Sequence, residues 1–202
     1  MCEDTESMNW PLQPGSAQWF ALAVKPRFEK AVAQALAMKG YDAFLPLYRK
    51  HYQYGTRSKD SVLPLFPGYV CCRFDLQTRL PILTTPGVLQ VLGAGSMPIP
   101  LSDVEVNSLQ TAMKAQFPVE PYPFVDTGQR VRIKSGALAG VEGIVIGCKQ
   151  SLRLVLSIAL LQRSVLLEVD RNQVIVEEVP GWRDGRLWPA PGAAPFDVLQ
   201  GD

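Results

Sequence analysis

The spacing of apolar residues changes twice within the first forty positions of the chain. Trp19–Val24 is an unbroken apolar run of strand-forming residues, which predicts a buried strand. From Phe28 to Leu36 apolar residues recur every three or four positions, and this period predicts an amphipathic helix. Gly40 is expected to end the helix, because glycine readily adopts the left-handed conformation that follows a helix C-terminus.

Strand-forming residues return after this helix. Ala43–Tyr54 and Pro64–Phe74 are rich in aromatic and apolar residues, which predicts two strands. The polar stretch Gly55–Ser61 between them predicts an exposed basic loop. Val88–Leu92, bounded by glycine on both sides, predicts another short strand.

A helix start signal lies at Ser102, with a glutamate three residues later at Glu105. In such a capping box the serine hydroxyl accepts a hydrogen bond from a backbone amide of the first turn, and the glutamate reaches back to the cap amide. The helix is expected to bury Leu109 and Ala112 and to end before Pro118.

After residue 128 the apolar residues take a period of two. Val131 and Ile133 alternate with charged residues, as in a half-buried strand. Further strands are predicted around Ile144–Ile146, Leu152–Leu160, Val165–Val169 and Val174–Val176. Several short strands with glycine-rich turns predict a small β-barrel. The apolar run Leu152–Leu161 is also compatible with a helix, so a second domain that switches its fold remains an alternative.

Three glycines, Gly136, Gly140 and Gly143, lie between the first two of these strands. A tight connection requires positive φ angles or a close approach of two backbones, and glycine allows both. We interpret these glycines as structural.

Composition divides the chain. Its 202 residues, 47% of them apolar, suffice for one large or two small domains and argue against wholesale disorder. We predict a first domain at 18–117 and a second at 128–179. Three proline- or glycine-containing segments flank them: a flexible extension at 1–17, a semi-rigid linker at 118–127 and a tail at 180–202.

Several classes of chemistry lack their residues. The single histidine and the absence of any C-x-x-C spacing argue against a metal site, and no cofactor is expected. The motifs of P-loop nucleotide hydrolases, zincins and α/β-hydrolases are missing. The adjacent Cys71 and Cys72 suit reduced thiols better than a disulfide framework. A nucleophilic pair of Cys71 with His51 remains an enzymatic alternative.

The net charge of +1 hides an uneven distribution. Ten Lys and Arg but only four acids lie between Lys25 and Arg79, whereas residues 1–17 carry three acids. This basic segment favours contact with nucleic acid. No apolar stretch approaches the length of a membrane span, and the acidic start lacks an apolar signal region, so we expect a cytoplasmic protein without membrane contact.

The order of short motifs resembles that of the NusG-type transcription elongation factors. The matching strings are W-F-A-L-A-V-K-P-R-F-E (19–29), F-L-P (44–46), L-F-P-G-Y-V (65–70), T-P-G-V (85–88), P-I-P-L-S (98–102) and G-Q-R-V-R-I-K-S-G-A-L-A-G-V-E-G-I-V (128–145). The resemblance implies an α+β fold: an NGN domain, in which helices flank an antiparallel sheet, followed by a small SH3-like KOW β-barrel.

The resemblance also implies partners. The first domain is expected to bind the clamp helices of the β′ subunit of RNA polymerase. The residues carried over to this contact are Phe66, Pro67 and Tyr69, with Phe44 and Leu45 beside them. Thr78 and Arg79 correspond to the region that meets the gate loop of the β subunit in RfaH-like members.

Non-template or upstream DNA near the transcription bubble is the second implied partner. The cations expected to face it are Lys25, Arg27 and Lys30 at a strand-to-helix turn, with Arg57, Lys59, Arg49 and Lys50 as a second basic group. A helix N-terminus flanked by cations is a suitable place for phosphate.

The second domain departs from the housekeeping pattern at Ala159–Arg163, where A-L-L-Q-R replaces a Phe-Gly-Arg-type turn. This string resembles specialised paralogues of the RfaH-like or polysaccharide-operon type, and it weakens the carry-over of ribosomal protein S10 or Rho as KOW partner. The sequence therefore predicts a monomeric, non-enzymatic transcription elongation and antitermination factor. A KOW-containing, ribosomal-type RNA-binding protein is the alternative.

Overall fold

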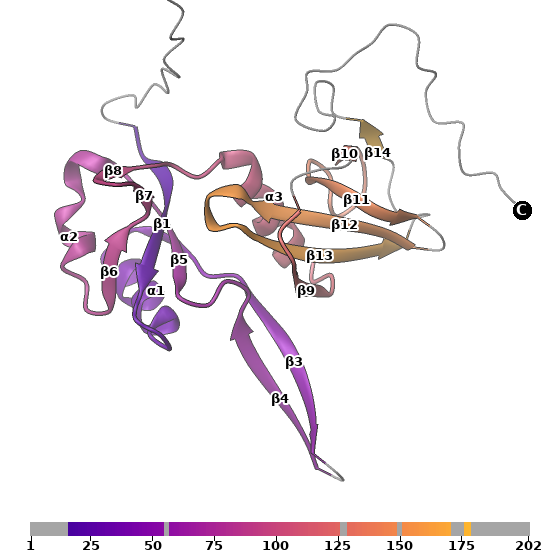
Figure 1. Ribbon diagram of the computed structural model, residues 1–202, viewed down its shortest axis with the longest axis horizontal. Helices are drawn as coiled ribbons and strands as arrows, with labels where there is room; N and C mark the ends of the chain where they lie inside the picture. The colour runs from indigo at the N-terminus through magenta and orange to yellow at the C-terminus, as the bar shows by residue number, and fades with distance from the viewer. Residues whose placement is uncertain (1–15, 55–56, 126–128, 149–150, 171–175, 179–202) are drawn as a thin grey trace, which may run out of the picture. The chain divides into compact units, whose positions relative to one another are not determined.

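The apolar run near the start of the chain is an inner strand of a four-stranded antiparallel sheet. Strand β1 (Gln18–Val24) pairs on one side with β5 (Tyr69–Phe74) and on the other with β6 (Val88–Val91), and β2 (Asp42–Phe44) pairs with the far edge of β5. The computed structural model describes residues 16–54, 57–125, 129–148, 151–170 and 176–178. Figure 1 shows β1 between β5 and β6.

The first hydrophobic core joins this sheet to a helix. The helix α1 (Glu29–Met38) contributes Val32 and Leu36, both fully buried. The strands supply Phe20, Leu22, Val24, Val70, Cys72 and Phe74. The helix ends before Gly40, which has a φ of 84°, so the strand–turn–helix prediction is confirmed.

Shorter elements complete the first of two contact units. They are the 3-10 turn η1 (Leu76–Thr78), helix α2 (Leu80–Leu83), and strands β7 (Gly93–Ala94) and β8 (Met97–Pro98). The first unit comprises the described residues up to Leu45 together with Pro67–Leu101. The second comprises Pro46–Phe66 and the described residues from Ser102 onward.

A long hairpin replaces the basic loop predicted at Gly55–Ser61. Strands β3 (Leu47–Tyr54) and β4 (Arg57–Pro64) form a two-stranded sheet whose ladder runs from Leu47↔Pro64 to Tyr54↔Arg57 (Figure 1). The loop prediction was wrong because ladder hydrogen bonds join backbone groups and tolerate polar side chains. The two long strands predicted on either side are also shorter, since Leu45-Pro46 and the turn at Phe66–Gly68 interrupt them.

The second unit contains a six-stranded antiparallel sheet and a helix. The strand order is β14-β10-β11-β12-β13-β9, and α3 (Asp103–Lys114) belongs to the same unit. The strands are β9 (Val119–Tyr122), β10 (Gln129–Ile133), β11 (Glu142–Cys148), β12 (Ser151–Ile158), β13 (Arg163–Asp170) and β14 (Val176–Glu178), with the 3-10 turn η2 (Ala159–Leu161) after β12. The fold class is α+β, as predicted.

The structure bears on two sequence predictions for this unit, the conformation of 152–161 and the linker at 118–127. The segment that is compatible with a helix, 152–161, forms β12 and η2 here. Part of the predicted linker forms β9, which pairs with β13 at the edge of the sheet, with Pro121 opposite Val165. An edge strand tolerates proline because one of its sides needs no ladder hydrogen bond. The extension at 1–15 and the tail from 179 onward lie outside the described residues.

Candidate functional site

A basic turn connects β1 to α1. Lys25 and Arg27 lie in the turn and Lys30 in the first turn of the helix, and all three side chains are exposed. Arg27 has a φ of 70°, in the left-handed region. The backbone amide of Lys25 donates to the carbonyl of Gly87 (2.8 Å), and that of Phe28 donates to the carbonyl of Lys25 (3.0 Å). The structure therefore brings these three predicted DNA-contacting residues together where β1 leads into α1.

The second predicted basic group lies on the hairpin rather than on a loop. Arg49 and Lys50 belong to β3 and are exposed, and Lys59 on β4 is exposed as well. Arg57 begins β4, and its side chain lies outside the described part.

The turn before β5 carries the residues predicted to meet the polymerase clamp. Pro67 is exposed, and Tyr69, the first residue of β5, is half-buried. Phe44 is half-buried at the end of β2, opposite Cys71 of β5, and Leu45 packs against the first core. Phe66 differs from the expectation, because only 1% of it is exposed. Its ring is not a surface group in this structure, so the accessible residues are Pro67, Tyr69 and Phe44.

A buried carboxylate that the sequence did not single out holds this turn. Glu29 at the start of α1 is buried, and its Oε1 accepts a hydrogen bond from the backbone amide of Gly68 (2.8 Å). The bond ties the turn at Pro67-Gly68 to the N-terminus of a helix, where a negative charge is stabilised. Glu29 thus positions the turn; the acid in the first helical turn was its only sequence signal.

Thr78 and Arg79 lie in a compact turn between β5 and α2, and both are exposed. Asp75 accepts hydrogen bonds from the Gln77 amide through its side chain (2.9 Å) and from the Thr78 amide through its carbonyl (2.9 Å). The turn therefore has a defined backbone conformation that presents these two side chains.

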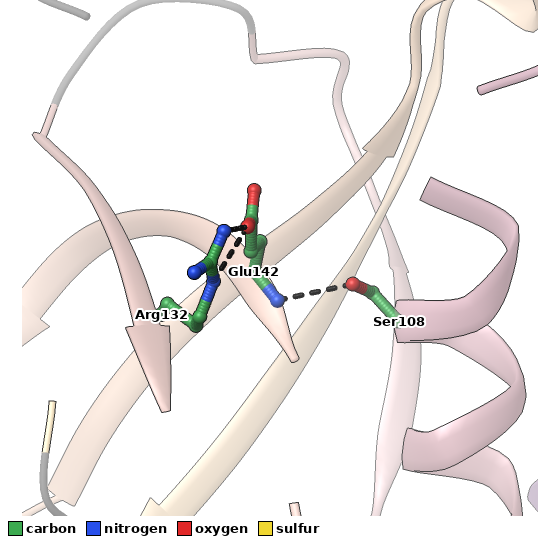
Figure 2. A network of polar contacts seen from close by, with 3 residues as sticks. All are labelled: Ser108, Arg132 and Glu142. Atoms are coloured by element: carbon green, nitrogen blue, oxygen red, sulfur yellow. Dashed lines mark hydrogen bonds and ion pairs between the residues drawn. The ribbon is translucent and has the colours of Figure 1, made fainter. Parts of the chain in front are cut away.

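In the second unit, α3 is hydrogen-bonded to the sheet. The Ser108 hydroxyl accepts from the Glu142 amide of β11 (3.0 Å), and the Glu142 carboxylate accepts from the guanidinium of Arg132 (Figure 2). Glu105 Oε1 accepts from the Ala159 amide of η2 (3.3 Å). The predicted capping box is wrong: Ser102 precedes the helix but makes no side-chain cap hydrogen bond. The Glu105 carboxylate accepts from η2 rather than from the cap amide.

Burial of Glu105 gives a testable pH dependence. Burial raises its pKa above the ordinary glutamate value, against the opposing effects of the Ala159 amide and the Arg130 charge. The folded chain therefore binds this proton more tightly than the unfolded chain, so its contribution to stability falls as pH rises from the ordinary pKa through the folded-state pKa. We expect Glu105→Gln to remove this decrease.

The measurement is the urea midpoint of both proteins at several pH values. The stability of the variant relative to the unsubstituted chain should increase with pH across this window and then level off. Asp103→Asn, which changes an exposed acid of the same helix, is the control. A pH-independent difference for Glu105→Gln would contradict the assignment.

The cysteines of the first sheet are not arranged as nucleophiles. Cys71 and Cys72 are free thiols buried on β5. Burial raises the pKa of each to about 12, with smaller contributions from the Cys72 thiol on Cys71 and from Asp42 on Cys72. His51 is exposed on β3, where its Nδ1 lies 2.6 Å from Asp60 Oδ1. This geometry disfavours the alternative Cys–His pair.

We expect iodoacetamide to alkylate Cys71 and Cys72 about a hundredfold or more slowly in the native protein at pH 8 than in urea, because the thiolate is the reactive form. Mass-spectrometric peptide mapping separates these two sites from Cys2 and Cys148. Similar native and denatured rates at Cys71 would contradict the burial and restore the enzymatic alternative.

Two further properties of the described residues bear on function. Within these ranges no group of three His, Cys, Asp or Glu side chains is arranged to hold a metal ion. None of the helices in the described part is long and apolar enough to cross a membrane.

Comparison with known proteins gives a consistent set of similarities. Residues 17–110 match the family model described as transcription termination factor nusG. The transcription termination/antitermination protein NusG of Deinococcus radiodurans is 30% identical over 140 residues, which cover 60% of this chain and 73% of that protein. The Helicobacter pylori protein of the same name is 27% identical over 122 residues, covering 59% of this chain and 69% of the relative.

A third relative and a solved structure are also similar to this chain. NusG of Borreliella burgdorferi is 24% identical over 180 residues and is covered to 98%, with 79% of this chain. A structure described as domain interaction in Thermotoga maritima NusG has a TM-score of 0.47 and 18% identity, and covers 81% of this chain and 97% of its own.

Proposed function

Because the chain belongs to the NusG family of transcription termination and antitermination factors, we propose that it binds RNA polymerase and modulates pausing or termination. Residues 18–117 are the polymerase-binding domain of this proposal, and residues 128–179 are the KOW domain. The protein acts in the cytoplasm as a monomer and forms no covalent intermediate.

One observation carries the polymerase contact: an exposed apolar turn is fixed by a buried carboxylate. The Glu29–Gly68 hydrogen bond holds Pro67 and Tyr69 in place beside Phe44. An aromatic and proline surface of this kind suits the side of a helix, and buried aromatic anchors dominate such contacts. The β′ clamp helices are the proposed partner, and Leu45 packs against the core of the same unit.

We assign two further contacts to the remaining exposed groups. Lys25, Arg27 and Lys30 are proposed to meet phosphates of non-template or upstream DNA, with Arg57 and Lys59 as a second basic group. Thr78 and Arg79 are proposed to meet the β gate loop. A factor that bridges both sides of the polymerase cleft stabilises the closed state because it binds that state more tightly.

Pull-down with core RNA polymerase tests the clamp contact. We expect Tyr69→Ala combined with Pro67→Ala to weaken capture about tenfold or more, because truncated aromatic anchors account for most of the energy of such interfaces. Leu89→Ala is the matched control, since Leu89 is an exposed apolar residue on β6 of the same sheet. Equal capture of all three proteins would overturn the assignment.

We further propose that the protein acts as an antitermination factor at particular operons. The turn at Ala159–Arg163, which lacks the Phe-Gly-Arg pattern, supports a specialised paralogue and weakens the assignment of ribosomal protein S10 or Rho as its KOW partner. Transcription in vitro on a template with a pause site and a terminator, with and without the protein, tests this role. Unchanged pausing and termination with polymerase-bound protein would contradict it.

A further inference from the structure

The two faces of the β3–β4 hairpin differ in chemistry. Side chains alternate between the faces of a strand, and cross-strand partners share a face. The register Tyr48↔Leu63, Lys50↔Ser61 and Tyr52↔Lys59 therefore assigns one face to Tyr48, Lys50, Tyr52, Lys59, Ser61 and Leu63. This set is named the tyrosine face.

Two contacts confirm the division. Lys50 Nζ lies 5.2 Å from the centre of the Tyr52 ring, so these side chains meet on the tyrosine face. His51 Nδ1 contacts Asp60 Oδ1 at 2.6 Å on the opposite face. Asp60 is the only acid in the sequence between Leu47 and Pro64. The described tyrosine face therefore holds cations and aromatic rings without an acidic side chain.

The tyrosine face is partly accessible to a ligand. Its two strands form a sheet of their own, and the Lys50 and Lys59 side chains are exposed. Tyr48 and Tyr52 are half-buried rather than core residues. Tyr48 and Tyr52 are four residues apart on one strand, about 13 Å at the usual rise, so each ring can meet a different base.

We propose that the tyrosine face binds single-stranded DNA, with bases stacked on Tyr48 and Tyr52 and phosphates contacted by Lys50 and Lys59. Aromatic rings between cations are the common device for holding a single strand without sequence preference. A duplex keeps its bases stacked inside and offers mainly phosphates, for which tyrosine rings are not needed. The inference rests on the proposed function, which places the chain beside an exposed DNA strand, and adds a contact separate from the Lys25–Arg27 turn.

Fluorescence anisotropy of the full chain with a labelled oligothymidine at low salt tests the proposal. We expect Tyr48→Ala and Tyr52→Ala each to weaken binding fivefold or more, while Tyr52→Phe stays near the unsubstituted chain because its ring still stacks. Gln53→Ala, on the opposite face near the same end, should have no effect. The tyrosine effects should persist when Lys25 and Arg27 are both changed to alanine.

Three results would overturn the inference: no binding of oligothymidine, equal losses for Gln53→Ala and Tyr52→Ala, or tighter binding of a matched duplex or oligouridine RNA. Capture by core polymerase keeps this test separate from that of the proposed function. Tyr48→Ala and Tyr52→Ala should retain polymerase binding, whereas Tyr69→Ala should weaken polymerase binding and still bind oligothymidine.

Discussion

Replacing Phe20 by alanine is expected to lower the free energy of unfolding of the first unit by about 3–5 kcal/mol. Phe20 is fully buried on β1, and its ring centre lies 4.8 Å from that of Phe74 on β5. The substitution removes a whole ring from the core and leaves a cavity that a paired inner strand cannot collapse to fill. A loss of this size is a large part of the stability of a domain.

Urea denaturation combined with hydrogen exchange at β1 amides measures this effect where it arises. Met38→Ala is the control: it also truncates a large apolar side chain of the same unit, but Met38 is 79% exposed, so the change should be within about 0.5 kcal/mol. A loss below about 1 kcal/mol for Phe20→Ala would mean that the ring is not part of a tightly packed core.

Gly143→Ala is expected to destabilise the second sheet by about 1–3 kcal/mol, because it forces atoms into occupied space. A Cβ at this position would lie 2.7 Å from Leu154 Cγ and 2.8 Å from the Val155 carbonyl oxygen. Neither atom can move away easily. The Leu154 side chain is fully buried, and the carbonyl belongs to the backbone of β12, which pairs with β11. The two strands therefore have to separate locally.

Gly140→Ala separates this overlap from backbone strain. A Cβ on Gly140 meets nothing within 4 Å, but the φ of 86° costs a residue with a side chain about 1–2 kcal/mol. Hydrogen exchange should show faster opening of β11 and β12 in Gly143→Ala, and only local changes near the turn in Gly140→Ala. Unaltered exchange in β12 of Gly143→Ala would contradict the close approach.

The spacing of apolar residues predicted the elements that are specified by the burial of their own side chains. The apolar run of β1 and the helical spacing from Phe28 to Leu36 reflect which positions are buried, and apolar residue types indicate those positions directly. The turn glycines Gly136 and Gly140 both have positive φ, as predicted. These features are local, so a short window of sequence contains the whole signal.

Features that depend on pairing or hydrogen bonding with another segment were missed. β4 contains a run of polar residues and is a strand because β3 supplies its hydrogen bonds. β9 contains a proline and is a strand because the edge of β13 is available to it. Glu105 leaves the expected capping box because the Ala159 amide, far away in the sequence, competes for its carboxylate.

The features of the candidate site also fall into those that local sequence predicts and those that depend on tertiary packing. The cations of the β1–α1 turn were found because their neighbours in sequence are their neighbours in space. The burial of Phe66 and the hydrogen bond from Gly68 to Glu29 depend on tertiary packing, which no local pattern of residue types reports. The sequence could therefore single out the segment that we propose to face polymerase, but it could not decide which side chains of that segment are exposed.

The pairing of β1 has a consequence for the order of folding during synthesis. Its register joins Phe20 to Cys72 and Leu22 to Val91, so both of its neighbours are translated long after it. Contacts between residues so far apart in sequence form slowly, whereas the ladder from β11 through β13 connects strands that are adjacent in the chain. A nascent chain thus exposes Trp19–Val24 until β5 and β6 have left the ribosome, and this is the interval in which the apolar run is available to chaperones and to aggregation.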